Sequence, residues 1–143
     1  MQKVKWGILG TANIARWATI PGMKQSEYCE MYAIAGRSLE KAESFKKEYG
    51  FEKAYGSYED LLADPEVQLV YIALPHSHHH KWTIESLKAG KHVLCEKAFA
   101  INEKQTREMI EMSEKTGLLL AEAIWTRYMP SRFMIQEIIE RGE

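Results

Sequence analysis

Short runs of apolar residues alternate along this chain with longer segments whose apolar residues recur at helical spacing. The short runs are rich in Val, Ile, Leu and aromatic residues, and turn-forming or polar residues follow them, as is typical of buried strands. They predict about six strands, at Val4–Leu9, Glu30–Ala35, Lys53–Tyr55, Leu69–Leu74, His92–Cys95 and Leu118–Ala121.

The segments between these runs predict helices with recognisable ends. Ser38 is placed to cap a helix that ends at Gly50, and Asn102 with Gln105 has the spacing of a capping pair for a helix that ends at Gly117. The other predicted helical segments are Asn13–Thr19, closed by Pro21 and Gly22, a turn over Tyr58–Leu62, a helix after Pro75 that ends at Gly90, and Ser131–Arg141.

Apolar strands that alternate with amphipathic helices indicate an α/β fold, because parallel strands are covered by helices on both faces. We therefore expect a doubly wound parallel sheet of the Rossmann type. Such sheets bind ligands at the carboxyl ends of their strands, where the strand order reverses. The functional residues should then lie directly after each strand.

Composition changes this prediction little. The 143 residues have room for one domain with a core, which we expect to span residues 1–143. The net charge of −1 gives no reason to expect a nucleic acid or an anionic membrane as partner.

Cys29 and Cys95 form no CxxC pair, and we expect buried free thiols. The N-terminal residues lead into a strand without a signal segment, so we expect a cytoplasmic protein.

The first turn carries a variant of the dinucleotide-binding pattern. Gly10, Thr11, Ala12, Asn13 and Ile14 follow the first strand, and Ala15 stands in the place of the third glycine. A glycine permits the tight turn, and small residues let the pyrophosphate and the helix approach closely. The pattern is GxAxxA and not GxGxxG, so its position between the first strand and the first helix carries the prediction.

The end of the second strand predicts which dinucleotide is bound. NAD-binding domains place a carboxylate there to accept hydrogen bonds from the ribose 2′-hydroxyl. This chain has Arg37 and Ser38 instead. A guanidinium pairs with a 2′-phosphate, which a carboxylate would repel, so we expect NADP in preference to NAD. The alternative is a surface arginine beside a helix cap.

A histidine cluster follows the fourth strand. His76 and His80 would have the spacing of two zinc ligands on one helix, but Pro75 is expected to keep His76 in the turn before the helix. We therefore expect no metal site. Leu74, Pro75, His76 and His79 are instead predicted to lie beside the ribose and nicotinamide, with His78 and His80 as helix-surface or packing residues.

The residues at the end of the fifth strand are similar to those of a known protein family. Glu96 and Lys97 stand there, and together with the first turn and Pro75-His76 they resemble the Gfo/Idh/MocA family of NAD(P)-dependent oxidoreductases. The stretch from Ala121 to Pro130 is similar to the branch that contains dimeric dihydrodiol dehydrogenases and NADP-dependent D-xylose dehydrogenases. The resemblance covers essentially the whole chain.

The resemblance implies roles for four residues. Lys97 would be the catalytic lysine that reaches the nicotinamide ribose and the reacting hydroxyl, and Glu96 would position the cofactor. Trp125 and Arg127 would contact the cofactor and the pocket floor. The alternatives are a solvated lysine at a strand end and, for Trp125, simple core packing. Ala98 replaces the proline that the family carries after the Glu-Lys pair.

The family's second half supplies the general acid–base residue and most substrate contacts, and we expect that this substrate domain is absent. The chain would then be the NADP-binding part of an oxidoreductase that transfers a hydride at a carbinol carbon of a sugar, polyol or dihydrodiol, and would be inactive alone. We expect it to associate with the missing domain, a partner subunit or a second copy. The alternatives are a non-catalytic dinucleotide-binding module that regulates a partner and, from the histidines, metal-dependent hydrolysis.

Overall fold

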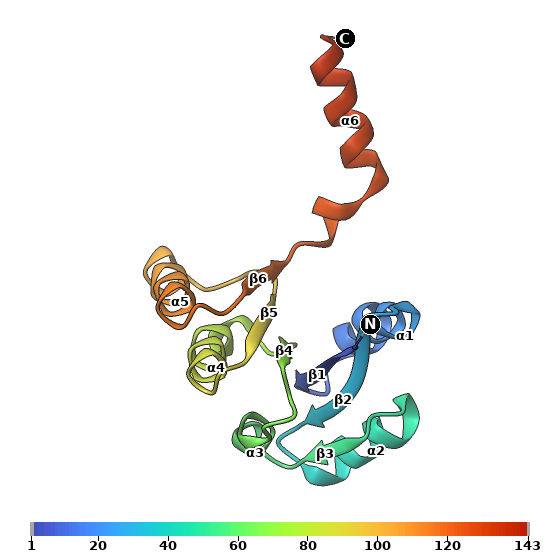
Figure 1. The fold of residues 1–143 in the computed structure, drawn as a ribbon, viewed down its shortest axis with the longest axis vertical. Helices are drawn as coiled ribbons and strands as arrows, with labels where there is room; N and C mark the ends of the chain where they lie inside the picture. Colours follow the sequence, from blue (N-terminus) through green and yellow to red (C-terminus); the bar gives the residue numbers. More distant parts are fainter. Residues whose placement is uncertain (1, 143) are drawn as a thin grey trace.

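A computed structural model describes residues 2–142, and its centre is a six-stranded sheet (Figure 1). Every pair of neighbouring strands is parallel, and the order is β3-β2-β1-β4-β5-β6. This is the order of the dinucleotide-binding Rossmann fold, and it confirms the predicted fold class. The strands are β1 (Val4–Leu9), β2 (Cys29–Ala35), β3 (Lys53–Tyr55), β4 (Leu69–Ile72), β5 (His92–Glu96) and β6 (Leu120–Ala123).

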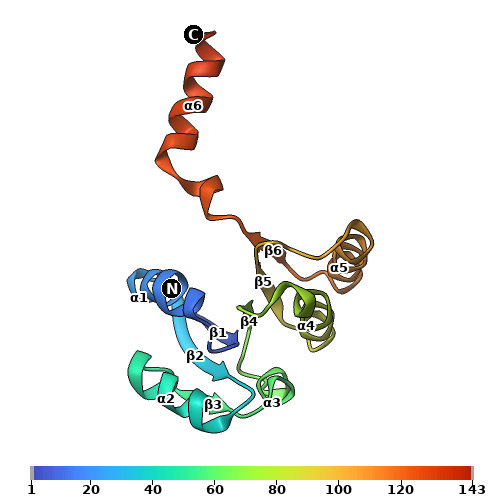
Figure 2. The same ribbon diagram turned by 180° about the vertical axis from the view of Figure 1, so that it is seen from behind.

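Helices cover both faces of the sheet (Figures 1 and 2). On one face lie a π-helical segment η1 (Ala15–Thr19), α1 (Ile20–Gln25) and α2 (Leu39–Tyr49). On the other lie α3 (Tyr58–Ala63), α4 (His76–Lys88) and α5 (Glu103–Thr116). Each face has its own cluster of buried apolar side chains, because central strands such as β4 are apolar at successive positions.

The predicted helix caps form as the sequence indicated. The Ser38 Oγ accepts the Lys41 amide at 3.4 Å, and the Asn102 side chain accepts the Gln105 amide at 2.9 Å. The reciprocal half of a capping box does not form, since the Gln105 side-chain oxygen is buried without a partner. Gly50 ends α2 in the left-handed conformation that glycine favours.

Several predicted boundaries are wrong: the fourth strand ends at Ile72 and not at Leu74, and the fifth extends to Glu96. Two further errors have a clear physical cause. Pro21 and Gly22 do not close the first helix: Pro21 lies in the first turn of α1, where its missing amide hydrogen costs nothing, and the helix continues to Gln25. The sixth strand begins at Leu120 and not at Leu118. The Leu118 amide donates to the Ser113 carbonyl and completes the end of α5, so Leu118 is not free to pair with β5.

The last helix stands apart from the sheet. After β6 come a 3-10 turn η2 (Trp125–Tyr128) and α6 (Pro130–Arg141), which extends away from the other elements in both views (Figures 1 and 2). Its apolar side chains are exposed, as the fractions for Ile139 (69%) and Met134 (63%) show. Among residues 2–142, no helix has the length and apolar character needed to cross a membrane.

Candidate functional site

The turn after β1 requires a glycine. Gly10 has a φ of +105°, and its amide donates to the Ala35 carbonyl of β2 at 2.9 Å. A Cβ atom at this position would lie 2.7 Å from the Ala73 carbonyl oxygen and 2.9 Å from the Leu74 side chain. The turn after β1 therefore passes directly against the turn after β4, at the point where the strand order reverses.

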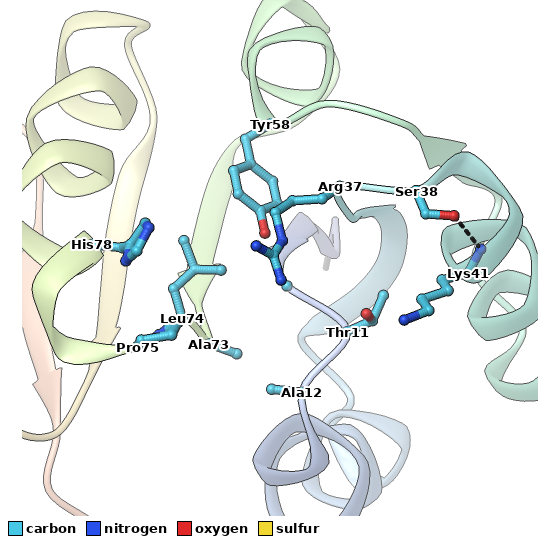
Figure 3. A pocket seen from close by; sticks show the side chains of 11 residues that line it. Thr11, Ala12, Arg37, Ser38, Lys41, Tyr58, Ala73, Leu74, Pro75 and His78 are labelled. Carbon is cyan, nitrogen blue, oxygen red and sulfur yellow. Dashed lines mark hydrogen bonds between the residues drawn. The ribbon is translucent and has the colours of Figure 1, made fainter.

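A cleft of about 470 Å³ opens at this reversal point (Figure 3). The turns after β1, β2 and β4 form most of its wall, and α3 and α4 complete it. The lining residues are Gly10, Thr11, Ala12, Arg37, Ser38, Lys41, Tyr58, Ala73, Leu74, Pro75 and His78. The structure thus brings seven of the predicted cofactor residues together, from Gly10, Thr11 and Ala12 through Arg37 and Ser38 to Leu74 and Pro75.

One side of the cleft is cationic. The Arg37 and Lys41 side chains extend into the open space from the end of β2 and the first turn of α2 (Figure 3). The lining residues include no Asp or Glu. Two cations that line one cleft without a carboxylate favour a doubly charged anion, such as a phosphate monoester. The opposite wall, at Leu74 and Pro75, is apolar.

Four lining residues were not among the predicted cofactor residues, and one of them, Ala73, is simply the residue before Leu74. The other three differ in how far the sequence could have identified them. Lys41 lies three residues after the Ser38 cap, and this spacing on a predicted helix could have identified it. Tyr58 comes from α3, and its position over the Arg37 side chain depends on the tertiary structure (Figure 3). Burial raises the pKa of Tyr58 and the Arg37 charge lowers it, with a net increase. The third residue, His78, was predicted to be a surface or packing residue, but it lines the cleft.

His79, which was predicted to lie beside the ribose and nicotinamide, is in the core and not in the wall of the cleft. It is fully buried, with one ring nitrogen 2.7 Å from the Leu74 carbonyl oxygen and the other 2.8 Å from that of Ala98. Both ring nitrogens are engaged by the protein, so in this structure His79 offers no direct contact to a ligand. It instead ties the turn after β4 to the turn after β5.

The other histidines form no metal centre. Helix α4 begins at His76, so the prediction that His76 lies in a turn is wrong: Pro75 occupies the position before the helix, where it needs no amide hydrogen. His76 and His80 are therefore one turn apart on the helix, yet the His80 Nε2 lies 2.7 Å from the Glu108 carboxylate. Within residues 2–142, no group of three or more His, Cys, Asp or Glu side chains is arranged to hold a metal ion.

Glu96 is the last residue of β5 and Lys97 follows it. The neighbouring strand, β4, leads into the turn that contains Leu74 and Pro75. One Glu96 oxygen accepts the Tyr71 hydroxyl at 2.7 Å, and the other accepts the Lys97 amide at 3.1 Å. The Lys97 side chain is exposed to solvent. The carboxylate is therefore held in place, while the ammonium is free to meet a ligand.

The remaining predicted residues lie outside the cleft wall. Asn13 and Ile14 are exposed in the helical residues that directly precede η1, and His76 is exposed at the start of α4. Trp125 is 65% exposed and Arg127 is also exposed, both in η2. The structure does not bring Trp125 and Arg127 to the cleft, and their predicted cofactor contacts remain predictions.

The comparison with known sequences identifies relatives. Residues 4–123 match the family model for the Gfo/Idh/MocA oxidoreductases, described as an NAD-binding Rossmann fold. The NADP(+) D-xylose 1-dehydrogenase of Hypocrea jecorina is 43% identical over 152 residues, covering 98% of this chain and 39% of that enzyme. The trans-1,2-dihydrobenzene-1,2-diol dehydrogenase of Mus musculus is 38% identical over 140 residues, covering 97% of this chain and 42% of that enzyme. The chain thus spans about two fifths of the length of these relatives.

Solved structures show the same architecture. A 3-ketoreductase from Actinomadura kijaniata, in complex with TDP-benzene and NADP, superposes with a TM-score of 0.93 and 30% identity, covering 99% of this chain and 44% of that one. An NAD-binding oxidoreductase from Klebsiella pneumoniae gives a TM-score of 0.90 and 29% identity, covering 98% of this chain and 39% of that one. The chain therefore belongs to the Gfo/Idh/MocA oxidoreductase family, and it contains that family's NAD(P)-binding Rossmann domain.

Proposed function

We propose that this chain binds NADP in the cleft and serves as the cofactor domain of a dehydrogenase or reductase. The observation that carries the proposal is the pair of cations, Arg37 and Lys41, that line the cleft together with Ser38 in a wall without carboxylates. A ribose 2′-phosphate is the dinucleotide group that needs such a site, because NAD presents a neutral hydroxyl there. The named cofactor of the Hypocrea jecorina and Actinomadura kijaniata relatives is NADP, which supports the same choice.

The rest of the cleft fits the remainder of a dinucleotide. Gly10 and Ala12 keep the first turn free of bulky side chains, so that a pyrophosphate can approach the backbone. The apolar wall at Leu74 and Pro75 leads from the cleft toward the end of β5, where Glu96 and Lys97 stand. We infer that the nicotinamide half extends in that direction.

Lys97 is the proposed catalytic residue. When bound, the nicotinamide supplies or accepts the hydride at a carbinol or carbonyl carbon. A lysine ammonium beside the oxygen of that carbon stabilises the negative charge that develops there, and it can donate a hydrogen bond to the hydroxyl. Glu96 holds the Lys97 amide at 3.1 Å and thereby orients the turn. The substrate classes of the relatives support a sugar, polyol or dihydrodiol as the substrate.

The relatives are more than twice as long as this chain. We propose that a substrate domain or partner subunit completes the site and that the chain alone turns over little. The exposed apolar side chains of α6 are the surface proposed to meet that partner or a second copy. The buried free thiols of Cys29 and Cys95 fit the reducing cytoplasm expected from the sequence.

Titration of the purified chain with NADPH and NADH tests the cofactor assignment. We expect NADPH to bind more tightly, and Arg37→Ala to weaken NADPH binding about tenfold or more while leaving NADH binding nearly unchanged, because a charged hydrogen bond contributes about 1.5–3 kcal/mol. Lys41→Ala should weaken the same preference to a smaller degree. The fluorescence of the nicotinamide and of the four tryptophans reports binding.

Arg107→Ala is the matched control. Arg107 is an exposed arginine on α5 that pairs with Glu103 at 2.6 Å, far from the cleft wall, so its loss should change neither dissociation constant. Equal affinities for NADPH and NADH in the unmodified chain would contradict the 2′-phosphate assignment. Tight NADPH binding that Lys97→Ala leaves unchanged, with no turnover after addition of a substrate domain, would favour the non-catalytic module.

A further inference from the structure

The side chain of Tyr71 connects the middle of the sheet to the proposed hydride side of the site. Tyr71 lies on β4 opposite Leu94 of β5, and Glu96 is two residues farther along β5 on the same face. Such diagonal neighbours are within reach of a long aromatic side chain. The Tyr71 hydroxyl donates to Glu96 Oε1 at 2.7 Å, and the Tyr71 residue is fully buried.

Glu96 also contacts the residue that follows it, Lys97. Its second oxygen, Oε2, accepts the backbone amide of Lys97 at 3.1 Å. The carboxylate therefore bridges a buried phenol and the backbone from which the Lys97 side chain departs. A side chain with two such anchors loses the rotational freedom that an exposed glutamate at a strand end would keep.

The phenol remains a donor throughout the working pH range. Burial raises the pKa of Tyr71 far above its ordinary value, and the charge of Glu96 adds to that increase, whereas a hydrogen bond with Thr19 opposes it. Tyr71 therefore stays protonated. It can therefore donate its hydrogen bond to the Glu96 carboxylate.

We propose that Tyr71 is a positioning residue for the nicotinamide half of the cofactor, acting through Glu96 on the direction of Lys97. The inference rests on the proposed function.

The Tyr71 hydroxyl distinguishes a positioning role from a packing role, because phenylalanine would fill the same space in the core. A packing role predicts loss of stability and a parallel loss of affinity for every ligand of the cleft. A positioning role predicts loss only for ligands that carry the nicotinamide half.

Two ligands distinguish these roles. NADPH spans the whole site, whereas adenosine 2′,5′-bisphosphate occupies only the part near Arg37 and Lys41. We expect Tyr71→Phe to raise the dissociation constant of NADPH about tenfold, since the lost hydrogen bond involves a charged group, and to leave that of the bisphosphate within about twofold. The emission maximum of bound NADPH should also shift toward that of the free cofactor.

Tyr55→Phe is the matched control. The Tyr55 hydroxyl also donates to a buried carboxylate, at 2.6 Å to Asp64, but neither residue lines the cleft. Its removal should lower stability without changing the ratio of the two dissociation constants. Glu96→Gln is the second variant, in case Tyr71→Phe does not fold. It should reproduce the NADPH-specific loss, and combining it with Tyr71→Phe should add little further loss, because both changes break one connection.

The outcomes separate the inference from the proposed function. A parallel rise of both dissociation constants in Tyr71→Phe, or no rise in either, overturns the positioning role and leaves the cofactor assignment standing. An NADPH-specific loss that Glu96→Gln does not share also overturns it, because Glu96 is the intermediary. Failure of the unmodified chain to bind either ligand overturns the proposed function and the inference with it.

Discussion

At the residue scale, four polar groups form hydrogen bonds with the buried Asp64. The Tyr55 hydroxyl and the Lys53 ammonium reach one carboxylate oxygen at 2.6 and 2.9 Å. The Glu66 amide donates to the other oxygen at 2.9 Å, and the buried Lys91 ammonium donates to the Asp64 carbonyl at 2.7 Å. These contacts join β3, the loop after α3 and the start of β5.

This environment predicts acid sensitivity. Burial favours the neutral form of Asp64, but the hydrogen bonds from Tyr55, Glu66 and Lys53 outweigh it and lower the pKa to about 2, from 3.8. A depressed pKa stabilises the fold above the unfolded-state value, and that stability is lost as the pH falls from about 4 through about 2. Asp64→Asn should therefore lower the free energy of unfolding at pH 7 by about 2 kcal/mol.

Urea denaturation at pH 7 and at pH 2 measures this effect. The difference in stability between wild type and Asp64→Asn should shrink as the pH falls, because the wild-type carboxylate becomes protonated. Asp60→Asn, an exposed position in the first turn of α3, serves as the control and should change stability by less than about 0.5 kcal/mol. A pH-independent difference would show that Asp64 acts through its shape and not its charge.

The histidines of α4 show which side-chain directions the sequence could have predicted. The buried positions of the helix, His79, Trp82, Thr83, Ser86 and Leu87, have the spacing of one helix face. Extending the pattern of Trp82 and Leu87 back by one turn would have placed His79 in the core. The prediction failed because the start of the helix was uncertain, and a shift of one residue rotates a side chain by about 100°.

On the element scale, the first turn depends on one backbone conformation. Gly10→Ala would bring a Cβ atom within 2.7 Å of a backbone oxygen at a φ of +105°. We expect this change to lower the free energy of unfolding by more than about 2 kcal/mol and to abolish NADPH binding, because the turns after β1 and β4 must move apart. Thermal unfolding and NADPH titration measure the two effects.

Gly22→Ala is the control for the same substitution. Gly22 lies within α1, and a Cβ atom there would meet no atom within 4 Å. Alanine favours a helix over glycine by about 1 kcal/mol, so this variant should be slightly more stable than wild type and should bind NADPH equally well. If Gly10→Ala behaved in the same way, the close approach of the two turns would not be required.

The order and type of most elements were predictable, because apolar runs, helix caps and glycine stops indicate the same structure. Two boundaries were predicted wrongly because the residues there fit either of two neighbouring structures. Pro21 and Gly22 are typical of a helix end, but the π-helical segment before them lets Pro21 begin a new turn. Leu118 is a good strand residue, but its amide ends α5. Local patterns do not rank such alternatives.

At the scale of the whole molecule, α6 presents an exposed apolar surface that other protein chains could contact. Its exposed apolar residues include Ile135, which is 57% exposed, and Ile138, which is 45% exposed. We expect the purified chain to self-associate with increasing concentration through this helix, and Ile135→Glu to reduce the association. NADPH affinity should stay unchanged, because α6 is not part of the cleft wall.

Light scattering over a range of concentrations, combined with the NADPH titration, measures both effects. Gln136→Glu introduces the same negative charge at the neighbouring position, where the side chain forms a hydrogen bond with Glu140 at 3.0 Å, and should leave association unchanged. A strictly monomeric wild type at high concentration would contradict the expectation.

Both full cations of the cleft lie within residues 36–41, on one strand end and one helical turn. The proposed hydride-side residues, Glu96 and Lys97, lie far away in the sequence. Under the proposed cofactor assignment, a few adjacent codons determine whether the chain uses the reductive or the catabolic nicotinamide pool of a cell, and other codons specify the residues of the reaction. A lineage could move such an enzyme from one pool to the other by exchanging this short segment, without rebuilding its chemistry.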